Sequence, residues 1–228
     1  MFPDIDYLAW IEGRPEAATH DLGSSDLRPV TGGSVVPAML DGLADQPGTT
    51  VETQLAERYD VPPEQVLVTP GASVANLVAA ATALGDGGTV LVEKPGYEPM
   101  WETPRALGAT VERFVRTRDD AWTLDPDRVA AAMHDPVDVV SVTNRHNPTG
   151  VVASRDTVAD VAATAREHDA RLLVDEVYGP YGGDDGGRGF GGPTAVGLEG
   201  CVVTGSLTKF FGLGDLRVGW LVADRAFA

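Results

Sequence analysis

The chain has 228 residues, of which 43% are hydrophobic, and its 34 acidic and 17 basic residues give a formal net charge of −17. A chain of this length can bury a substantial core, whereas its negative field repels nucleic acid and anionic membrane surfaces, so neither is an expected partner. The acidic residues are spread along the chain, and arginine is preferred to lysine. Together these features indicate a halophilic composition, in which high salt screens the repulsion.

The rest of the composition excludes several kinds of site. The single cysteine, Cys201, cannot form an internal disulfide, and it begins an apolar run, as a small core residue does. The sequence has no Cys/His cluster with zinc-binding spacing, so no metal site is expected. No apolar stretch approaches the roughly 20 residues that span a membrane, and the first residues lack a signal-peptide pattern. We therefore expect a soluble, cytoplasmic protein.

The pattern of residues changes near position 50. Residues 1–50 are expected to be irregular because prolines interrupt any long element there. Beyond them, short apolar runs rich in β-branched residues alternate with helical patterns. In chain order we predict a helix at Val51–Tyr59, a strand at Gln65–Thr69, a helix at Ser73–Leu84, a strand at Thr89–Glu93, a helix at Glu98–Leu107, a strand at Thr110–Val115, a helix at Pro126–Met133, a strand at Val137–Thr143, a helix at Arg155–His168, and strands at Arg171–Asp175, Cys201–Gly205 and Val218–Val222. This alternation is typical of a three-layer α/β/α fold, with a mostly parallel sheet of about seven strands covered by helices on both faces.

The segment from Ser206 to Trp220 is the most informative part of the sequence. Lys209 is one of only two lysines, and it lies three residues after Ser206 and eight before Arg217. A lysine amine is nucleophilic only when it is deprotonated, and its charge responds strongly to burial and to cationic neighbours. The spacing suits a lysine that forms a Schiff base with an aldehyde whose phosphate is held by Ser206 and Arg217. The alternative is a lysine with a buried stem and a solvated amine in a strand-to-loop turn.

Other polar residues follow the predicted strands, and ligands of open α/β sheets bind at the carboxyl ends of strands. Asn147 comes after one predicted strand, and Asp175 ends the next. Gly71, Ala72 and Ser73 follow an earlier strand and open a helix, whose free N–H groups and dipole favour a phosphate. A simple N-cap role is the alternative for Ser73.

Taken in order, these motifs resemble the cofactor site of the class I/II pyridoxal-phosphate-dependent aminotransferases, the fold-type I family. They are Asn-Pro-x-Gly at Asn147, Asp-x-x-Tyr from Asp175 to Tyr178, Ser-x-x-Lys ending at Lys209, and the later Arg217. The resemblance covers most of the chain, and the four motifs together are specific. It implies pyridoxal 5′-phosphate (PLP) as cofactor, an amino acid and a 2-oxo acid as substrates, and a homodimer.

The resemblance also implies roles for individual residues. Lys209 would hold the cofactor and shuttle a proton at the substrate Cα, while Asp175 would keep the pyridine nitrogen protonated. Tyr178 and Asn147 would hydrogen-bond the phenolic oxygen, and Tyr97 would stack on the ring. The structural alternatives are a loop cap for Asp175, a plain Asn-Pro turn for Asn147 and packing for Tyr97. The implied phosphate ligands are Gly71, Ala72, Ser73, Ser206 and Arg217.

The chain departs from the family pattern at several positions. Arg145 stands where many relatives have proline, and Asp215 stands where glycine is frequent. No tyrosine lies between Tyr7 and Tyr59, where many relatives supply one to the partner subunit's phosphate. Gly23 resembles the N-terminal glycine of the family near the substrate carboxylate, to which Asn147 would also contribute.

The resemblance further implies that residues 51–228 form an aspartate aminotransferase-like large domain and that residues 1–50 form an N-terminal segment belonging to the arm and small domain. Family members usually continue far beyond the arginine motif. We therefore expect a truncated or partial chain that lacks most of the small domain, ends within the large domain and is itself inactive. The expected reaction is amino-group transfer. The alternatives are another enzyme of the same scaffold, such as a β-lyase, decarboxylase or racemase, or a non-catalytic PLP-binding fragment.

Overall fold

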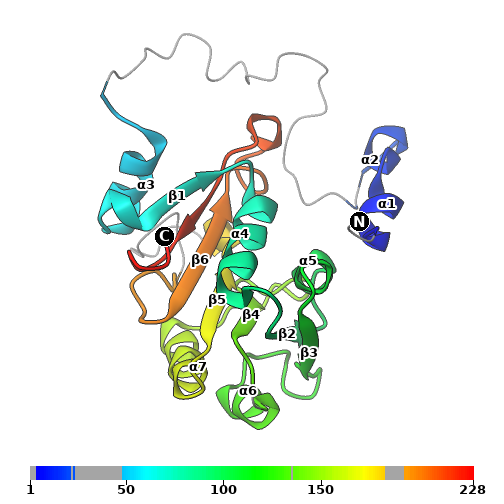
Figure 1. Ribbon diagram of the computed structural model, residues 1–228. Helices are drawn as coiled ribbons and strands as arrows, with labels where there is room; N and C mark the ends of the chain where they lie inside the picture. Colours follow the sequence, from blue (N-terminus) through cyan, green and yellow to red (C-terminus); the bar gives the residue numbers. More distant parts are fainter. Residues whose placement is uncertain (1–3, 22, 24–47, 135, 183–192) are drawn as a thin grey trace.

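The computed structural model describes residues 4–21, 23, 48–134, 136–182 and 193–228 (Figure 1). Its centre is a seven-stranded sheet with the strand order β1-β7-β6-β5-β4-β2-β3. Strand β7 runs antiparallel to both of its neighbours, β1 and β6, and the other paired strands are parallel. The carboxyl ends of the parallel strands therefore meet at one edge of the sheet.

The elements alternate along the chain. The strands are β1 Val66–Thr69, β2 Thr89–Lys94, β3 Thr110–Val115, β4 Val139–Thr143, β5 Arg171–Asp175, β6 Cys201–Ser206 and β7 Gly219–Val222. The helices are α1 Asp6–Ile11, α2 Arg14–Ala17, α3 Val51–Tyr59, α4 Ala72–Leu84, α5 Pro99–Ala106, α6 Pro126–Ala132 and α7 Arg155–Glu167. One-turn 3-10 helices occupy Pro63–Gln65, Gly179–Gly182 and Gly214–Leu216.

The sheet is buried on both faces, and each face has its own apolar core. Helices α3, α6 and α7 cover one face and α4 and α5 cover the other. Successive strand residues point to opposite faces. In β4, for example, Val140 packs toward the first group of helices and Val139 toward the second. Because α4 presents Ala75, Ala79 and Ala80 to the sheet, its backbone can approach closely.

Register aligns the ends of the central strands. Thr143 of β4 pairs with Asp175 of β5, which in turn pairs with Thr204 of β6. The polar ends of these strands therefore lie side by side, although they are far apart in the sequence.

The predicted fold class is confirmed. Each predicted strand and each predicted helix is present, with boundaries that differ by one or two residues where they differ. The prediction that residues 1–50 are irregular is wrong in part, because the helices α1 and α2 form there. Pro15 does not prevent α2, since it lies in the first turn of that helix, where proline is tolerated. Much of the predicted N-terminal segment, residues 24–47, lies outside the described residues.

Among the described residues, no helix has the length and apolar character needed to cross a membrane.

Candidate active site

A cavity of about 710 Å³ lies at the carboxyl ends of the central strands, where Thr143, Asp175 and Ser206 end β4, β5 and β6. Its wall contains nearly all of the site residues predicted from the sequence: Gly23, Ala72, Ser73, Tyr97, Asn147, Asp175, Tyr178, Ser206, Lys209 and Arg217. The remaining one, Gly71, is the N-cap of α4 directly before Ala72. Residues distant in the sequence thus meet in one cavity.

The start of α4 forms one corner of this cavity. The helix begins at Ala72 and is capped by Gly71, whose φ of 85° favours glycine. The first N–H groups of a helix have no partner within the helix, so this corner offers donors and a positive dipole end to an anion. The N-cap alternative for Ser73 is wrong, because Ser73 lies inside the first turn.

Arg217 and two glycines complete that corner. The Arg217 Nη2 donates a hydrogen bond to the carbonyl oxygen of Pro70 at 3.2 Å. A Cβ on Gly71 would lie 2.8 Å from the same Nη2, and a Cβ on Gly219 would lie 2.5 Å from the nitrogen of Ala72. Gly71 and Gly219 lack side chains. Only for this reason can Arg217 and the starts of β7 and α4 approach one another this closely.

Lys209 enters the cavity from the loop that follows β6. At the start of the loop, the buried Ser206 accepts a hydrogen bond at its Oγ from the backbone N–H of Thr208 at 3.3 Å. Lys209 itself is half-buried, and its charge opposes the rise that burial causes in the pKa of the Asp175 carboxyl. An amine and a carboxylate thus interact within the same cavity.

Asp175 is a buried carboxylate held by fixed donors. Its Oδ1 accepts the backbone N–H of Val177 at 3.0 Å, and its Oδ2 accepts the Asn76 amide at 2.9 Å. The Thr204 hydroxyl donates to the Asn76 Oδ1 at 2.6 Å and so orients that amide. Burial raises the pKa of Asp175, whereas the two hydrogen bonds and Lys209 oppose the rise. A further positive group beside this carboxylate would stabilise its ionised form.

Asn76 and Thr204 were missed by the sequence analysis. Asn76 lies four residues after Ala72 and therefore on the same side of α4, which is a signal available from the sequence. Thr204 lies beside Asp175 only through the pairing of β5 with β6, and a sequence pattern does not give that register.

Glu176 anchors the chain just beyond Asp175. Its Oε2 accepts the Thr194 hydroxyl at 2.7 Å, and its Oε1 accepts the backbone N–H of Ala195 at 2.6 Å. Burial raises the pKa of Glu176 to about 7, while the two hydrogen bonds oppose the rise. This side chain fixes the turn between Asp175 and Tyr178.

Tyrosines form another part of the wall. The Tyr97 and Tyr7 rings meet edge to face, with centroids 5.5 Å apart, and the Tyr7 N–H donates to the Glu98 carboxylate at 2.6 Å. These contacts connect α1 to the start of α5 (Figure 1). Burial raises the pKa of Tyr97 to about 12, and the nearby Tyr7 and Tyr178 add to the rise, so the phenol is neutral. Tyr7 was not predicted, because an isolated tyrosine in the N-terminal segment gives no signal.

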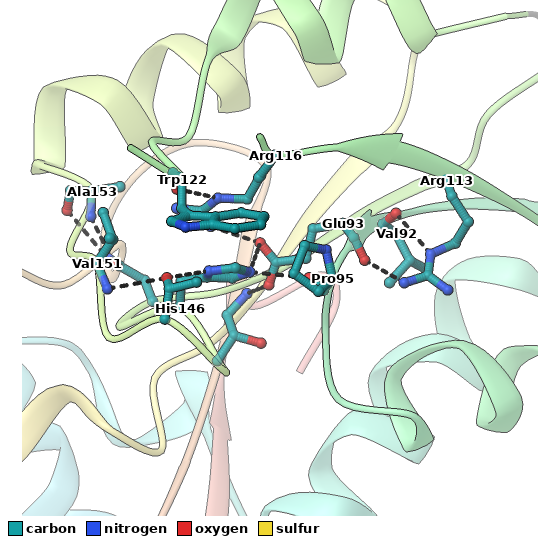
Figure 2. Close-up of polar contacts among 12 residues, drawn as sticks. Val92, Glu93, Pro95, Arg113, Arg116, Trp122, His146, Val151 and Ala153 are labelled. Carbon is teal, nitrogen blue, oxygen red and sulfur yellow. Dashed lines mark hydrogen bonds and ion pairs between the residues drawn. The ribbon is translucent and has the colours of Figure 1, made fainter. Parts of the chain in front are cut away.

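A buried charged cluster lies at the strand ends, where Glu93 is close to both Arg116 and His146 (Figure 2). Arg116 Nη1 and Glu93 Oε2 form an ion pair at 2.8 Å, and both side chains are almost fully buried. The other Glu93 oxygen accepts the backbone N–H of Thr143 at 2.6 Å. His146 Nε2 lies 3.8 Å from Glu93, and burial together with Arg116 lowers the pKa of His146 to about 4. The imidazole is therefore neutral near pH 7.

His146 connects two turns of the site. Its Nε2 bonds the Pro95 carbonyl oxygen at 3.0 Å, and its Nδ1 bonds the Thr149 hydroxyl at 2.7 Å. A carbonyl only accepts, so the neutral ring carries its hydrogen on Nε2 and accepts at Nδ1. The turn leading to Tyr97 is thereby fastened to the turn that carries Asn147.

Comparisons with known proteins show the family and the fold of this chain. The family described as "Aminotransferase class I and II" matches residues 44–228. The histidinol-phosphate aminotransferase of Halorubrum lacusprofundi is 32% identical over 180 residues, covering 78% of this chain and 48% of the relative. The glutamate-pyruvate aminotransferase AlaA of Escherichia coli is 27% identical over 166 residues, covering 72% of this chain and 40% of the relative. The chain thus spans about half the length of the curated relatives it matches.

Solved structures show the same fold. The aspartate aminotransferase from Thermus thermophilus superposes with a TM-score of 0.68 at 26% identity, covering 77% of this chain and 47% of that protein. A PLP-dependent aminotransferase from Streptococcus suis superposes with a TM-score of 0.79 at 22% identity, covering 99% of this chain and 63% of that protein. With the family match over residues 44–228, these likenesses identify the chain as a member of the class I and II aminotransferases, which depend on pyridoxal phosphate.

Proposed function

We propose that the protein is a PLP-dependent aminotransferase that moves an amino group between an amino acid and a 2-oxo acid. The observation that carries this proposal is that Lys209 and Asp175 share one cavity with the start of α4 and Arg217. The membership of the aminotransferase family supports the same reaction over β-elimination, decarboxylation or racemisation.

The residues of the cavity fit the cofactor. The N–H groups at the start of α4, the Ser206 hydroxyl and the Arg217 guanidinium suit a phosphate. The corner is shaped for close approach, because a Cβ on Gly71 would meet the Arg217 Nη2 at 2.8 Å. The buried Asp175, whose pKa is raised by burial, would gain a positive partner in a protonated pyridine nitrogen. Each polar end of the cofactor thus has a partner of suitable charge.

In this proposal, bound PLP supplies an electron-withdrawing ring that stabilises negative charge on the substrate Cα. Lys209 would hold the cofactor covalently and, once freed by the incoming substrate amine, would carry the Cα proton on its Nζ to the C4′ carbon of the cofactor. Asp175 keeps the ring nitrogen protonated, and Asn76 and Thr204 keep Asp175 in position. Asn147 and Tyr178 hydrogen-bond the phenolic oxygen.

Aromatic and N-terminal residues complete the proposed site. Tyr97 stacks on the ring, and Gly23 and Asn147 bind near the substrate carboxylate. Tyr7 and Leu8 of α1 line the same cavity, which supports residues 1–50 as an N-terminal segment that contributes to the site. Residues 51–228 are the proposed PLP-binding domain.

Further properties belong to the same proposal. The acidic, arginine-rich composition supports a halophilic, cytoplasmic protein, and the family supports a homodimer. A biosynthetic role is supported by relatives named histidinol-phosphate aminotransferase. A phosphorylated amine is accordingly one candidate substrate, beside ordinary amino acids.

Borohydride reduction of the PLP-loaded protein, followed by peptide mapping, tests the central assignment. The label should appear on Lys209, and Lys209→Ala should abolish it. Lys94, the other lysine of the chain, is exposed and provides the matched control, since Lys94→Ala should label normally. Label on Lys94 in the wild-type protein would overturn the proposal, and lyase products in place of amino transfer to an added 2-oxo acid would overturn the reaction class.

A further inference from the structure

A second cavity, of about 400 Å³, adjoins the candidate active site. It shares Asn147 and Tyr178 with the main cavity, so these two side chains form a common wall. Its described lining residues are Arg145, His146, Asn147, Pro148, Gly150, Tyr178 and Tyr181. None of them carries a carboxylate. This is unusual in a chain with a formal net charge of −17.

Arg145 is the charged residue of this cavity. Its Nη1 donates to the carbonyl oxygen of Gly150 at 3.2 Å, while its Nε is buried and has no acceptor among the described residues. A buried donor without an acceptor is costly, particularly on a charged group. The neighbouring His146 is neutral near pH 7, because burial and Arg116 lower its pKa to about 4. The positive charge of the described lining therefore rests on Arg145.

What distinguishes Arg145 from the other described arginines is its place in a cavity, because Arg113 and Arg155 also bond backbone carbonyls but line neither cavity. Several form ion pairs with carboxylates: Arg105, Arg116, Arg128, Arg166 and Arg171. Arg145 has no ion pair with any described residue. In this it matches Arg217, which lines the main cavity and is also tethered to a backbone carbonyl, that of Pro70 at 3.2 Å. Each guanidinium is thus held by a backbone carbonyl and has no ion pair with a carboxylate of the described residues.

We propose that Arg145 binds an anionic group of the substrate, a carboxylate or a phosphate, in this second cavity. The planar fork of an arginine matches both groups through paired hydrogen bonds. The tether to Gly150 orients the fork in advance, so that little freedom is lost on binding. Because Asn147 and Tyr178 border both cavities, a substrate whose amino group reacts at Lys209 extends past them toward Arg145. This assignment rests on the proposed function.

Aromatic rings give the cavity an apolar wall for the carbon skeleton between the two ends. The Tyr178 and Tyr181 ring centroids are 6.2 Å apart, and Tyr181 meets Phe210 edge to face at 5.2 Å. Tyr178 lines both cavities, so this ring lies between the lysine side and the arginine side of the site. The site therefore suits an acidic substrate with an apolar middle section.

Protection from chemical modification tests the anion site without any need for turnover. The PLP-loaded wild-type protein is treated with phenylglyoxal, which modifies arginine, and each arginine is followed by peptide mass spectrometry. The probes are acetate, succinate and inorganic phosphate, with sodium chloride at equal ionic strength as the control. We expect a probe at ten times its Kd to slow modification of Arg145 roughly tenfold. Arg118 is exposed and should be unaffected.

The probe that protects Arg145 indicates which anionic group of the substrate binds there. Acetate indicates a single carboxylate, succinate alone indicates a dicarboxylic substrate, and phosphate alone indicates a phosphorylated one. Each of these outcomes supports the proposal. If no probe protects Arg145 beyond the chloride control, the proposal is wrong. Because the test uses the wild-type chain, a folding defect cannot cause that result.

A variant supplies the second measurement. Arg145→Gln should weaken calorimetric binding of the protecting probe by roughly 10- to 100-fold, as expected for the loss of a charged hydrogen-bonding group. Arg118→Gln is the matched control and should bind as the wild type does. Unchanged binding by Arg145→Gln would contradict the inference. Failure of the proposed function appears elsewhere, as a missing PLP label on Lys209. In that case the substrate assignment falls, although Arg145 can still be protected.

Discussion

Gly219→Ala should weaken PLP binding by displacing the start of β7 from the start of α4, in the corner of the cavity proposed to hold the phosphate (the phosphate corner). A Cβ at this position would lie 2.3 Å from the carbonyl carbon of Gly71 and 2.5 Å from the nitrogen of Ala72. Real Cβ atoms essentially never approach another atom closer than 3.0 Å, so the start of α4 and the start of β7 must separate by about 0.7 Å. The obstructing atoms belong to the backbone, so no rotation of a side chain relieves the contact.

The size of the effect follows from this displacement. Forcing an extra carbon into a packed region costs typically about 1–3 kcal/mol of stability. The same shift moves the N–H groups of α4 relative to Arg217, and a misplacement of about 1 Å in a site can cost about 10²-fold. For about 0.7 Å we expect the affinity for PLP to fall at least roughly tenfold, with a lower melting temperature.

Two measurements check this expectation. PLP binding is titrated by absorbance, and thermal unfolding is followed without cofactor. Gly85→Ala is the matched control, because Gly85 ends the same helix at a positive φ of 56° with no atom within 4 Å of an added Cβ. It should lose some stability through backbone strain but retain PLP affinity. A Gly219→Ala protein with wild-type affinity and melting temperature would refute the reasoning about the phosphate corner.

Two further predictions concern the carboxylates at the end of β5. Assayed in a protein that spans the full length of the curated relatives, Asp175→Ala should slow transamination by roughly 10³-fold, or about 4 kcal/mol in the barrier, while PLP remains attached to Lys209; near wild-type turnover would exclude the assigned role. Glu176 has a folded pKa of about 7, above its ordinary value of 4.5, so its contribution to stability is fully present below pH 4.5 and is lost as the pH rises through 7. Relative to wild type, Glu176→Gln should therefore gain about 3 kcal/mol in unfolding free energy between pH 4.5 and pH 8, by urea titration. A difference that stays constant with pH would show that Glu176 titrates normally.

The fold was predictable because its signals are local. Each central strand is a short apolar run between turn residues, and β4 is buried along its whole length. The helices begin where capping residues or prolines stand, as Ser154 caps α7 and Pro126 opens α6. The N-terminal helix α1 has neither a side-chain cap nor a buried residue, so its sequence gave no comparable signal.

The ligand-facing residues were predictable for a different reason. They follow the ends of strands, where a parallel sheet collects its loops, and their chemistry is visible in the motif letters. The supporting residues were not predictable in this way. Glu93 lies on β2 and forms an ion pair with Arg116, the residue that follows the last residue of the neighbouring strand β3. Such a contact depends on the register of the two strands and on the path of the loop after β3. The bridging role of His146 between Pro95 and Thr149 was likewise not predictable, because the sequence shows only that His146 precedes Asn147.

The partners of the arginines differ between the protein surface and the cavities. Some exposed arginines of this acidic chain pair with carboxylates, as Arg166 does with Glu199. Arg217 and Arg145 each line a cavity and donate a hydrogen bond to a backbone carbonyl. The net charge repels anions from the protein as a whole, but that repulsion acts at long range and is screened by salt. Paired hydrogen bonds from a guanidinium act at contact and in a partly dry site, where screening is weak. A strongly acidic protein can therefore bind acidic substrates through guanidiniums that line its cavities, such as Arg217 and Arg145.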